Sequence, residues 1–458
     1  MEYTIKTISH YHKTSDQNYK QGSLNWVCIR KMRAFLNCIF LLLCFIAITS
    51  DIGTAAAKKS LTNRVDKKGR SEKCTLKHPL EGEKKNKPPK QICLPELPST
   101  QPWYNKSTLD SILIYYYNAN AKNPYEEMKK AKPEFIKDIK LLETRLRNLD
   151  WCKKVEYTGS SYEGLKISED GLEFDVMFVI DGTGLELVSI KGQEGYTNFK
   201  ASTKALRMLQ ESAGSTGFLS PKLVNSKFFG AVKKWQNKVD PTGQRMKLRN
   251  HGPATQMDVF NGTKKVWYSV DLVPAVEIKD NGEVKLYIPK PLKNDNTTWR
   301  RSFSREEKSI LKTLDKGNGC RRKVARVIKA MFKGEPTLRP FTSYYIKTTL
   351  LLTIQSFPDM SWKTSDVTER VLDVLGAIEF YLKQRYLPHY FIPSINLLVD
   401  MKEHVKLNML KRVRSLRRYE DKFVKAIDLR YKLRGETSGD KMENGMHEIE
   451  SKHEKSDL

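Results

Sequence analysis

The sequence has few cysteines, and none is spaced as a metal-binding pair. Its seven cysteines are scattered along 458 residues without a Cys-x-x-Cys motif, and the eight histidines do not gather near them. This pattern argues against a structural zinc site or a disulfide scaffold, and it favours a reducing compartment. Cys74 and Cys93 are the one pair that could join in an oxidising compartment.

Acidic residues are also fewer than basic ones. The chain carries 53 acidic against 81 basic residues, a net charge of +28, and the basic residues recur in blocks. Such an excess is typical of proteins that bind a polyanion, either nucleic acid or an anionic membrane surface. Apolar residues make up 39% of the chain, which is enough for a sizeable core and for two lobes or two to three domains.

Long apolar runs are scarce. The strongest, residues 34–49, is shorter than the roughly 20 residues of a membrane span and reaches that length only when extended to residue 57, with Asp51 inside. Three interpretations stay open: a membrane anchor, a signal peptide beginning near Met32, or an interfacial helix. The basic flank at residues 58–70 outweighs the preceding one, which favours an anchor with a cytoplasmic body.

Composition and periodicity predict an α+β protein with two lobes. A mixed sheet lobe carries a long spine helix over residues 126–149, and an all-helical lobe follows it. The predicted segments are a polar N-terminus at 1–33, the apolar segment at 34–57, a basic disordered linker at 58–106, the sheet core at 107–295, the helical lobe at 296–434 and a disordered tail at 435–458.

Individual elements follow from the same periodicities. Strands are expected at residues 155–158, 174–180, 186–190, 267–276 and 284–288. Helices are expected at residues 199–212, 226–239, 304–314, 321–333, 343–355, 365–385 and 401–433.

Two acids in one of these strands carry the chemistry. Glu173 and Asp175 lie at i and i+2 in an apolar run, so their side chains point to the same face of the sheet. Adjacent carboxylates repel, and burying them is costly unless a cation neutralises them. Asp271, in another apolar strand, would complete a site for two divalent cations such as Mg2+ or Mn2+. The pattern indicates metal-dependent phosphoryl or nucleotidyl transfer.

A glycine–serine turn precedes these acids. Gly159 follows a predicted strand and allows the backbone to approach a phosphate, whose oxygens the Ser160 hydroxyl can bind. Most such turns are ordinary, and an acid-x-acid pattern on a strand is usually a solvated face. Together they are much more specific.

At this point the residues resemble the Mab-21 group of nucleotidyltransferases, and within it the cyclic GMP-AMP synthase-like receptors. The resemblance covers about residues 107–434 in family order. The segments that carry it are Gly159-Ser160-x-x-Glu163-x-x-Lys166-Ile167, Glu173-Phe174-Asp175-Val176-Met177, Ser269-Val270-Asp271-Leu272-Val273-Pro274, Trp299-Arg300-x-Ser302-Phe303-Ser304, Cys320-Arg321-Arg322, Ser343-Tyr344-Tyr345-Ile346-Lys347-Thr348 and Tyr390-Phe391-Ile392-Pro393.

The resemblance implies a bilobal nucleotidyltransferase fold. It implies an enzyme that joins ATP and GTP into a cyclic dinucleotide on binding double-stranded nucleic acid, for a STING-type receptor in innate immunity. Glu173, Asp175 and Asp271 match the catalytic and metal-binding triad. The positions that match nucleotide contacts are Thr158, Ser160, Arg300, Ser302, Ser304, Glu307, Lys329, Ser343, Tyr344 and Lys347. Lys329 suits a phosphate and Tyr344 a purine face, although such residues are more often solvated or in the core.

One departure bears on the activating ligand. The vertebrate synthase carries a His/Cys zinc module between its Trp-Arg-x-Ser-Phe-Ser segment and the phosphate lysine, whereas residues 311–320 here hold one cysteine and no histidine. We therefore predict no zinc, and double-stranded RNA rather than DNA as the activator. The basic residues predicted to contact the duplex are Arg305, Lys308, Lys312, Arg321, Arg322, Lys323 and Arg326.

Two rival interpretations stay open. One is a catalytically inactive, membrane-anchored nucleotide-binding adaptor of the same fold, which the apolar segment at residues 34–57 suits. The retained carboxylates argue against it. The other is a non-cyclising nucleotidyltransferase that extends RNA.

Overall fold

The computed structural model describes Leu94 and residues 106–262, 265–293, 295–315 and 318–435. The predicted segments at residues 1–33 and 34–57, nearly all of the linker at 58–106, and residues 436–458 of the tail lie outside this part of the chain. Among the described helices, none combines the length and apolarity that a membrane crossing requires.

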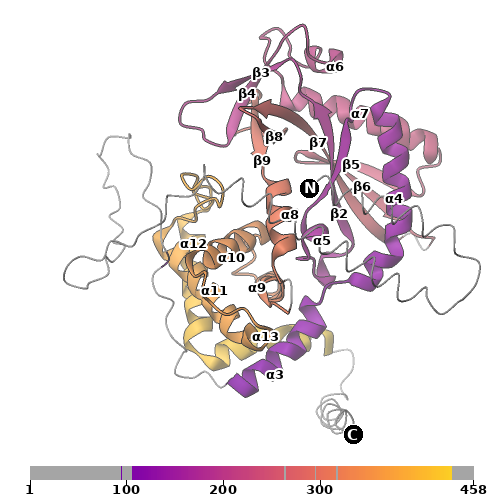
Figure 1. The fold of residues 1–458 in the computed structure, drawn as a ribbon. Helices are drawn as coiled ribbons and strands as arrows, with labels where there is room; N and C mark the ends of the chain where they lie inside the picture. Colours follow the sequence, from indigo (N-terminus) through magenta and orange to yellow (C-terminus); the bar gives the residue numbers. More distant parts are fainter. Residues whose placement is uncertain (1–93, 95–105, 263–264, 294, 316–317, 436–458) are drawn as a thin grey trace, which may run out of the picture. The chain divides into compact units, whose positions relative to one another are not determined.

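The described residues form a mixed sheet lobe and a helical lobe, which confirms the predicted α+β class (Figure 1). The strands are β1 (Lys154–Thr158), β2 (Glu173–Asp181), β3 (Leu185–Ser189), β4 (Tyr196–Ala201), β5 (Met246–His251), β6 (Ala254–Phe260), β7 (Val266–Asp280), β8 (Glu283–Ile288) and β9 (Thr298–Ser302). The helices of this lobe are α4 (Tyr125–Arg147), α5 (Ser160–Glu163), the short turn η2 (Ser168–Asp170), α6 (Arg207–Gln210) and α7 (Pro221–Val239).

The sheet is organised around β7. Its strand order is β1-β2-β7-β8-β9-β4-β3, and the β5–β6 hairpin joins through a second pairing of β6 with β7. The pairing of β2 with β7 is parallel, while every other pairing of named strands in the described residues is antiparallel. β7 can serve three neighbours because β2 pairs with its residues 269–277 along one edge, while β6 (266–272) and β8 (276–280) divide the other edge.

The two faces of β2 have different partners. Phe174, Val176 and Phe178 belong to the core that α4 and α7 complete, and Figure 1 shows both helices beside the sheet. Phe135 of α4 stacks on Phe174 with ring centroids 4.2 Å apart. Because side chains alternate along a strand, this packing directs Glu173 and Asp175 to the opposite face.

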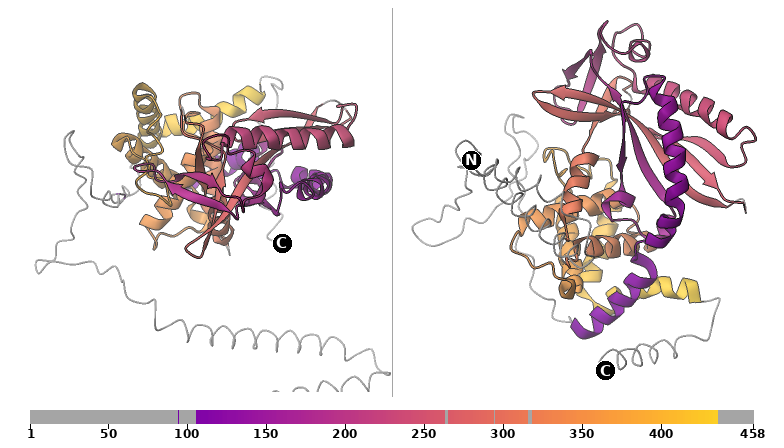
Figure 2. Two further views of the ribbon diagram at one scale, coloured as in Figure 1. Left: turned by 90° about the horizontal axis from the view of Figure 1, so that it is seen from above. Right: turned by 45° about the vertical axis from the view of Figure 1, so that its right-hand side comes forward.

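The helical lobe has its own core. It consists of α3 (Lys106–Tyr116), the π-helix η1 (Tyr117–Ala121), α8 (Ser304–Thr313), α9 (Arg321–Gly334), α10 (Ser343–Ser356), η3 (Thr364–Asp366), α11 (Val367–Gln384), α12 (Glu403–Arg418) and α13 (Glu420–Gly435). Figure 2 shows α3, the first described helix, lying against α13 near the other end of the described chain.

Some predicted elements were wrong. The helix expected at residues 199–212 is β4 followed by the short α6, because the alternating residues of β4 pair with β3 and β9. Strands β5, β6 and β9 were not predicted. The single helix expected at residues 401–433 is divided at Tyr419, whose extended backbone (φ −127°, ψ 120°) separates α12 from α13.

Two elements lie on the other side of the predicted division at residues 295/296. β9 pairs with β4 and β8 and so extends the sheet. In α3, Leu109 and Leu113 are buried in the core of the helical lobe. The chain therefore enters the helical lobe, builds the sheet, and returns.

Candidate active site

The site begins at the turn between β1 and α5. Gly159 adopts φ 75° and ψ −177°, a conformation that is essentially restricted to glycine. A Cβ atom built there would overlap the carboxylate of Asp175. Glycine is therefore required here for two reasons: it can adopt this backbone conformation, and it leaves space for the Asp175 carboxylate. The turn places Ser160 at the start of α5 and the buried Thr158 opposite Asp175.

The parallel register of β2 and β7 brings the third acid to the first two. Asp175 pairs with Asp271, and Glu173 with Ser269. Glu173, Asp175 and Asp271 therefore share one face of two neighbouring strands, as the strand pattern had suggested for the first two. The cost is visible in the pKa of Asp175, which burial, Glu173 and Asp271 raise to about 7. Burial and Glu173 likewise raise the pKa of Asp271.

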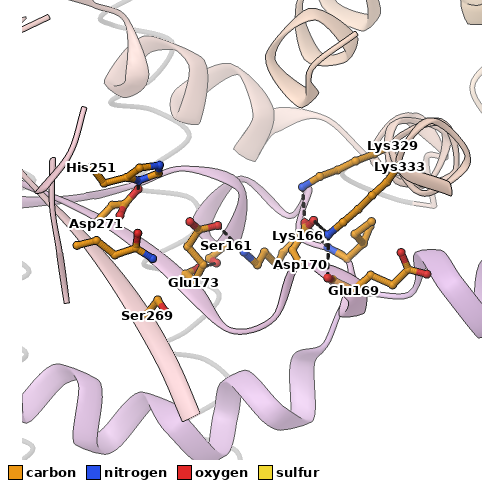
Figure 3. Close-up of polar contacts among 12 residues, drawn as sticks. Ser161, Lys166, Glu169, Asp170, Glu173, His251, Ser269, Asp271, Lys329 and Lys333 are labelled. Atoms are coloured by element: carbon orange, nitrogen blue, oxygen red, sulfur yellow. Dashed lines mark hydrogen bonds and ion pairs between the residues drawn. The ribbon is translucent and has the colours of Figure 1, made fainter. Parts of the chain in front are cut away.

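A lysine and a histidine of the protein contact this cluster. The nearly fully buried Lys166 places its Nζ atom 3.1 Å from Oε2 of Glu173 (Figure 3). On the other side, Nδ1 of His251 lies 3.6 Å from Oδ2 of Asp271. Oδ1 of Asp271 is buried without a hydrogen-bond partner. The Asp271 carboxylate thus has unused capacity to bind a cation.

The donor set fits hard divalent cations. Carboxylate oxygens are the ligands that Mg2+ and Mn2+ prefer, and the unpartnered Asp271 oxygen is one such ligand. As they stand, however, no three acidic, histidine or cysteine side chains of the described residues converge closely enough to hold an ion. In this arrangement Glu173 contacts Lys166, and Asp271 lies near His251.

A cavity of about 310 Å3 opens beside the carboxylates, between the two lobes. Glu173, Asp175 and the Gly159 turn line it from the sheet lobe, and α9 and α10 line it from the helical lobe. The predicted site residues that line this cavity are Ser160, Glu173, Asp175, Lys329, Ser343, Tyr344 and Lys347.

A buried ionic cluster connects the cavity walls. Nζ of Lys347 lies 2.7 Å from Oε2 of Glu307 and 3.2 Å from Oε1 of Glu163. Burial acts to lower the pKa of Lys347, but Glu307 and Glu163 outweigh it and raise that pKa. The cluster ties α5 to α8 and α10. Lys347 and Glu307, both predicted nucleotide contacts, are engaged with each other here.

Tyr344 is held by a second network. Backbone N–H groups of Phe391 and Ile392 donate to Nδ1 of His389, at 3.1 and 3.2 Å, so the proton of the neutral ring sits on Nε2. Nε2 then donates to the Tyr344 hydroxyl at 2.9 Å. Burial, Arg300 and Lys347 lower the pKa of His389 to about 4, which keeps the ring neutral. The Tyr344 ring is thereby fixed at the cavity.

Six of the predicted catalytic and nucleotide-binding residues do not line this cavity: Thr158, Asp271, Arg300, Ser302, Ser304 and Glu307. Arg300 and Ser302 belong to β9, and Ser304 begins α8. The hydroxyls of Ser302 and Ser304 lie 3.0 Å apart, and that of Ser304 lies 3.7 Å from the sulfur of Met177. They therefore share a sheet face with the carboxylates without lining the cavity.

Most of the predicted nucleic-acid contacts are occupied by protein groups. Arg305 pairs with Glu156 and Glu277, and Lys308 donates to the carbonyl of Tyr157. Arg321 and Arg322 form ion pairs with Asp315. Lys323 and Arg326 place their charged groups over the Tyr117 ring. Lys312 is the exposed member of the predicted set.

Several residues of the site were not predicted. Glu163 and Lys166 lay within the Gly159 motif, where their spacing could have drawn attention. His389 precedes the Tyr390-Phe391-Ile392-Pro393 segment. Asp170 contacts both Lys329 and Lys333 across the two lobes, and nothing local in the sequence marks these contacts.

Comparison with known proteins agrees with this geometry. Residues 161–313 match the Mab-21 protein nucleotidyltransferase domain, and residues 320–415 match the Mab-21 protein HhH/H2TH-like domain. The chain is 33% identical to cyclic GMP-AMP synthase-like receptor 3 of Stylophora pistillata over 295 residues, which is 60% of this chain and 84% of the relative.

Two other relatives are matched over less of their length. A cyclic GMP-AMP synthase-like receptor of Magallana gigas is 24% identical over 62% of this chain and 54% of its own length. The cyclic GMP-AMP synthase of Mus musculus is 26% identical over 54% of this chain and 57% of its own length.

Fold, site and relatives together define a nucleotidyltransferase. The chain belongs to the Mab-21 family, and within it to the type of the cyclic GMP-AMP synthase-like receptors, as the sequence motifs had indicated.

The first prediction concerns the space beside Gly159. Gly159→Ala should cost more unfolding free energy than Gly171→Ala and should abolish activity, because only the first Cβ collides with Asp175. Gly171 is a matched control: its φ and ψ (65°, −176°) are nearly the same, and its Cβ would meet nothing within 4 Å. The backbone penalty common to both is about 1–3 kcal/mol. Equal costs in urea unfolding would contradict the steric requirement.

The second prediction concerns the repulsion at Asp175. Its raised pKa means that the folded protein binds more protons than the unfolded chain between about pH 4 and pH 7, so this group destabilises the fold as pH rises through that window. Asp175→Asn should therefore gain stability over the natural protein from pH 5 to pH 8 in EDTA, by at most about 1.4 kcal/mol per pH unit up to pH 7.

Asp181, at the far end of β2, provides the control for that measurement. Burial acts to raise its pKa, but hydrogen bonds from Thr183 outweigh it, and the pKa is lowered. Asp181 is thus ionised in both states above pH 5, and the effect of Asp181→Asn should not change between pH 5 and pH 8. The same pH dependence in both variants would show that the carboxylate cluster is not its cause.

Proposed function

We propose that this protein joins ATP and GTP into a cyclic dinucleotide of the cyclic GMP-AMP kind when it binds double-stranded nucleic acid. The observation that carries the proposal is the register of β2 and β7, which sets Asp271 beside Asp175. Asp175 in turn lines a cavity together with Ser160, Lys329 and Tyr344. The names of the relatives favour cyclic GMP-AMP as the product.

Glu173, Asp175 and Asp271 are the proposed ligands of two Mg2+ or Mn2+ ions. When bound, such ions would polarise the attacking hydroxyl and neutralise the triphosphate and the leaving pyrophosphate. The chain contributes the rigid frame: two neighbouring strands fix the three carboxylates, and Gly159 leaves room for that of Asp175.

Other side chains would bind and orient the nucleotides. Lys329 provides a compact positive charge for a phosphate, and Ser160 and Ser343 provide hydroxyls at the cavity wall. The Tyr344 ring presents an apolar face to a purine, in an orientation that His389 fixes. Such a preorganised site acts mainly through positioning and charge neutralisation.

Double-stranded RNA is the proposed activator, with DNA less favoured. Residues 311–320 hold one cysteine and no histidine, too few ligands for a zinc module. Duplex RNA is recognised chiefly through shape and phosphate contacts, and Lys312 is the exposed basic residue of the set proposed to make them. We further propose that the product acts in innate immune signalling through a STING-type receptor, and that residues 34–57 anchor a cytoplasmic catalytic body to a membrane.

The third prediction is the reaction itself. The full-length protein, given ATP, GTP and Mg2+ or Mn2+, should form a cyclic dinucleotide when duplex RNA is added, as measured by mass spectrometry of the products. Asp175→Asn and Asp271→Asn should each abolish it. Asp181→Asn should retain the activity, because Asp181 lies on the same strand but does not line the cavity; its carboxylate is 3.6 Å from Nζ of Lys153.

Three other outcomes would contradict the proposal. Undiminished product from Asp175→Asn would refute the site. Linear or RNA-extended products would indicate a non-cyclising transferase. Nucleotide binding without any product, whatever duplex of RNA or DNA is added, would favour the inactive adaptor.

The fourth prediction concerns the duplex surface. Lys312→Glu should weaken binding of duplex RNA severalfold and reduce its salt dependence, because each phosphate contact contributes to the release of counterions. ATP affinity should not change, since Lys312 lies outside the cavity lining. The matched control is the same change at the exposed Lys383 of α11. If both variants bind RNA equally well in a filter-binding titration, the proposed surface is wrong.

A further inference from the structure

Two lysines of α9 converge on one carboxylate at the cavity. Nζ of Lys329 lies 2.5 Å from Oδ2 of Asp170, and Nζ of Lys333 lies 3.0 Å from Oδ1 of the same group. Lys333 also donates to the carbonyl of Glu169 at 2.8 Å. Figure 3 shows both lysine side chains reaching from α9 to η2. Each carboxylate oxygen therefore has its own ammonium partner.

The location of this cluster matters because Asp170 and Lys329 both line the cavity, together with Glu173 and Asp175. Lys329 is the residue proposed to bind a triphosphate. Its ammonium group is already paired with Asp170. Lys333 is not among the lining residues and adjoins the cavity through its contact with Asp170.

The charges of the cluster suit exchange with a phosphate. Burial lowers the pKa of Lys329, so this ammonium group needs an anionic partner. Burial acts to raise the pKa of Asp170, but Lys329 and Lys333 outweigh it and lower that pKa. Two cations share one anion, and the cluster keeps a net positive charge. A phosphate offers more charge and more oxygens than one carboxylate, so it can replace that carboxylate.

The short turn that carries Asp170 is held at its start, where the Ser168 hydroxyl donates to the carbonyl of Lys122 at 3.1 Å, and is open at its end. It is a single turn of 3-10 helix, Ser168–Asp170, followed by Gly171 at φ 65°. A side chain at Gly171 would meet nothing within 4 Å, so no neighbouring group holds the turn from that side. The lysines, by contrast, are fixed on a fourteen-residue helix.

We propose that Lys329 and Lys333 form an anion subsite for the triphosphate of a substrate nucleotide, and that Asp170 occupies this subsite in the ligand-free protein as an internal competitor. The inference rests on the proposed function, because it assigns the triphosphate to Lys329. It adds Lys333 as a second phosphate ligand, and it adds an acid that must leave before a nucleotide is fully bound.

Instead of competing with phosphate, Asp170 could act as a positioning residue that orients both lysines to bind it. The two roles predict opposite effects of neutralising it. A competitor weakens nucleotide binding, so its removal strengthens binding. A positioning group assists binding, so its removal weakens binding.

The test measures binding of ATP and of inorganic triphosphate to the full-length protein by calorimetry at low salt. Asp170→Asn should bind both roughly tenfold more tightly than the natural protein, which is about 1.4 kcal/mol. The control is Asp359→Asn, an exposed acid in the turn after α10, which changes net charge equally and should leave both affinities unchanged. Equal or weaker binding by Asp170→Asn would overturn the inference.

Lys333→Met provides a second variant. Its side chain is 42% exposed, so the fold should tolerate the change. It should bind inorganic triphosphate severalfold more weakly, and unchanged binding would exclude Lys333 from the subsite.

Thermal unfolding gives a readout that does not depend on activity. Without ligand, Asp170→Asn should unfold at a lower temperature than the natural protein, because Lys329 loses its partner. Added triphosphate should raise the unfolding temperature more in the variant than in the natural protein. The same increase in both would contradict competition.

Failure of the proposed function would look different. If neither the natural protein nor Asp170→Asn binds ATP at millimolar concentration, then the nucleotide site itself is wrong. If both bind ATP with the same affinity, then only the competition by Asp170 is wrong.

Discussion

The parallel pairing of β2 with β7 is the constraint on which the site depends. It sets Asp271 against Asp175 in register, two residues from Glu173 along the strand. A shift of one residue would turn Asp271 to the α4 and α7 face of the sheet and separate the acids. The apolar core on that face fixes the register, because Phe174, Val176 and Val270 must be buried there. The free energy of packing on one face of the sheet thus offsets the electrostatic repulsion between the carboxylates on the other.

Side chains of the protein then contact the charged groups of the site. Lys166 contacts Glu173, His251 contacts Asp271, and Asp170 contacts Lys329, so the anion- and cation-binding groups of the ligand-free site engage one another. The buried Glu163–Lys347–Glu307 cluster joins the two lobes across the same cavity. Binding of a metal or nucleotide would exchange these internal partners for those of the ligand.

The sequence was sufficient to predict those site residues and helices that local patterns mark. Glu173 and Asp175 stand out because acids at i and i+2 interrupt an apolar strand, and α4 and α7 to α11 follow from helical periodicity. It was insufficient where distant segments meet. Neither the contact of Lys333 with Asp170 nor that of His389 with Tyr344 leaves a local signature. Tyr419, which divides α12 from α13, fits a helical pattern, and no residue type at or beside it marks the extended backbone that it adopts.

The most direct test of the central claim is the number of Mn2+ ions bound by the full-length protein, measured by electron paramagnetic resonance with a non-hydrolysable ATP analogue. We expect two ions per chain in the natural protein and a loss of ion binding in Asp271→Asn, since Asp271 is one of the three proposed carboxylate ligands. The same number of ions, bound with the same affinity, in Asp271→Asn would contradict a site built by the β2–β7 register.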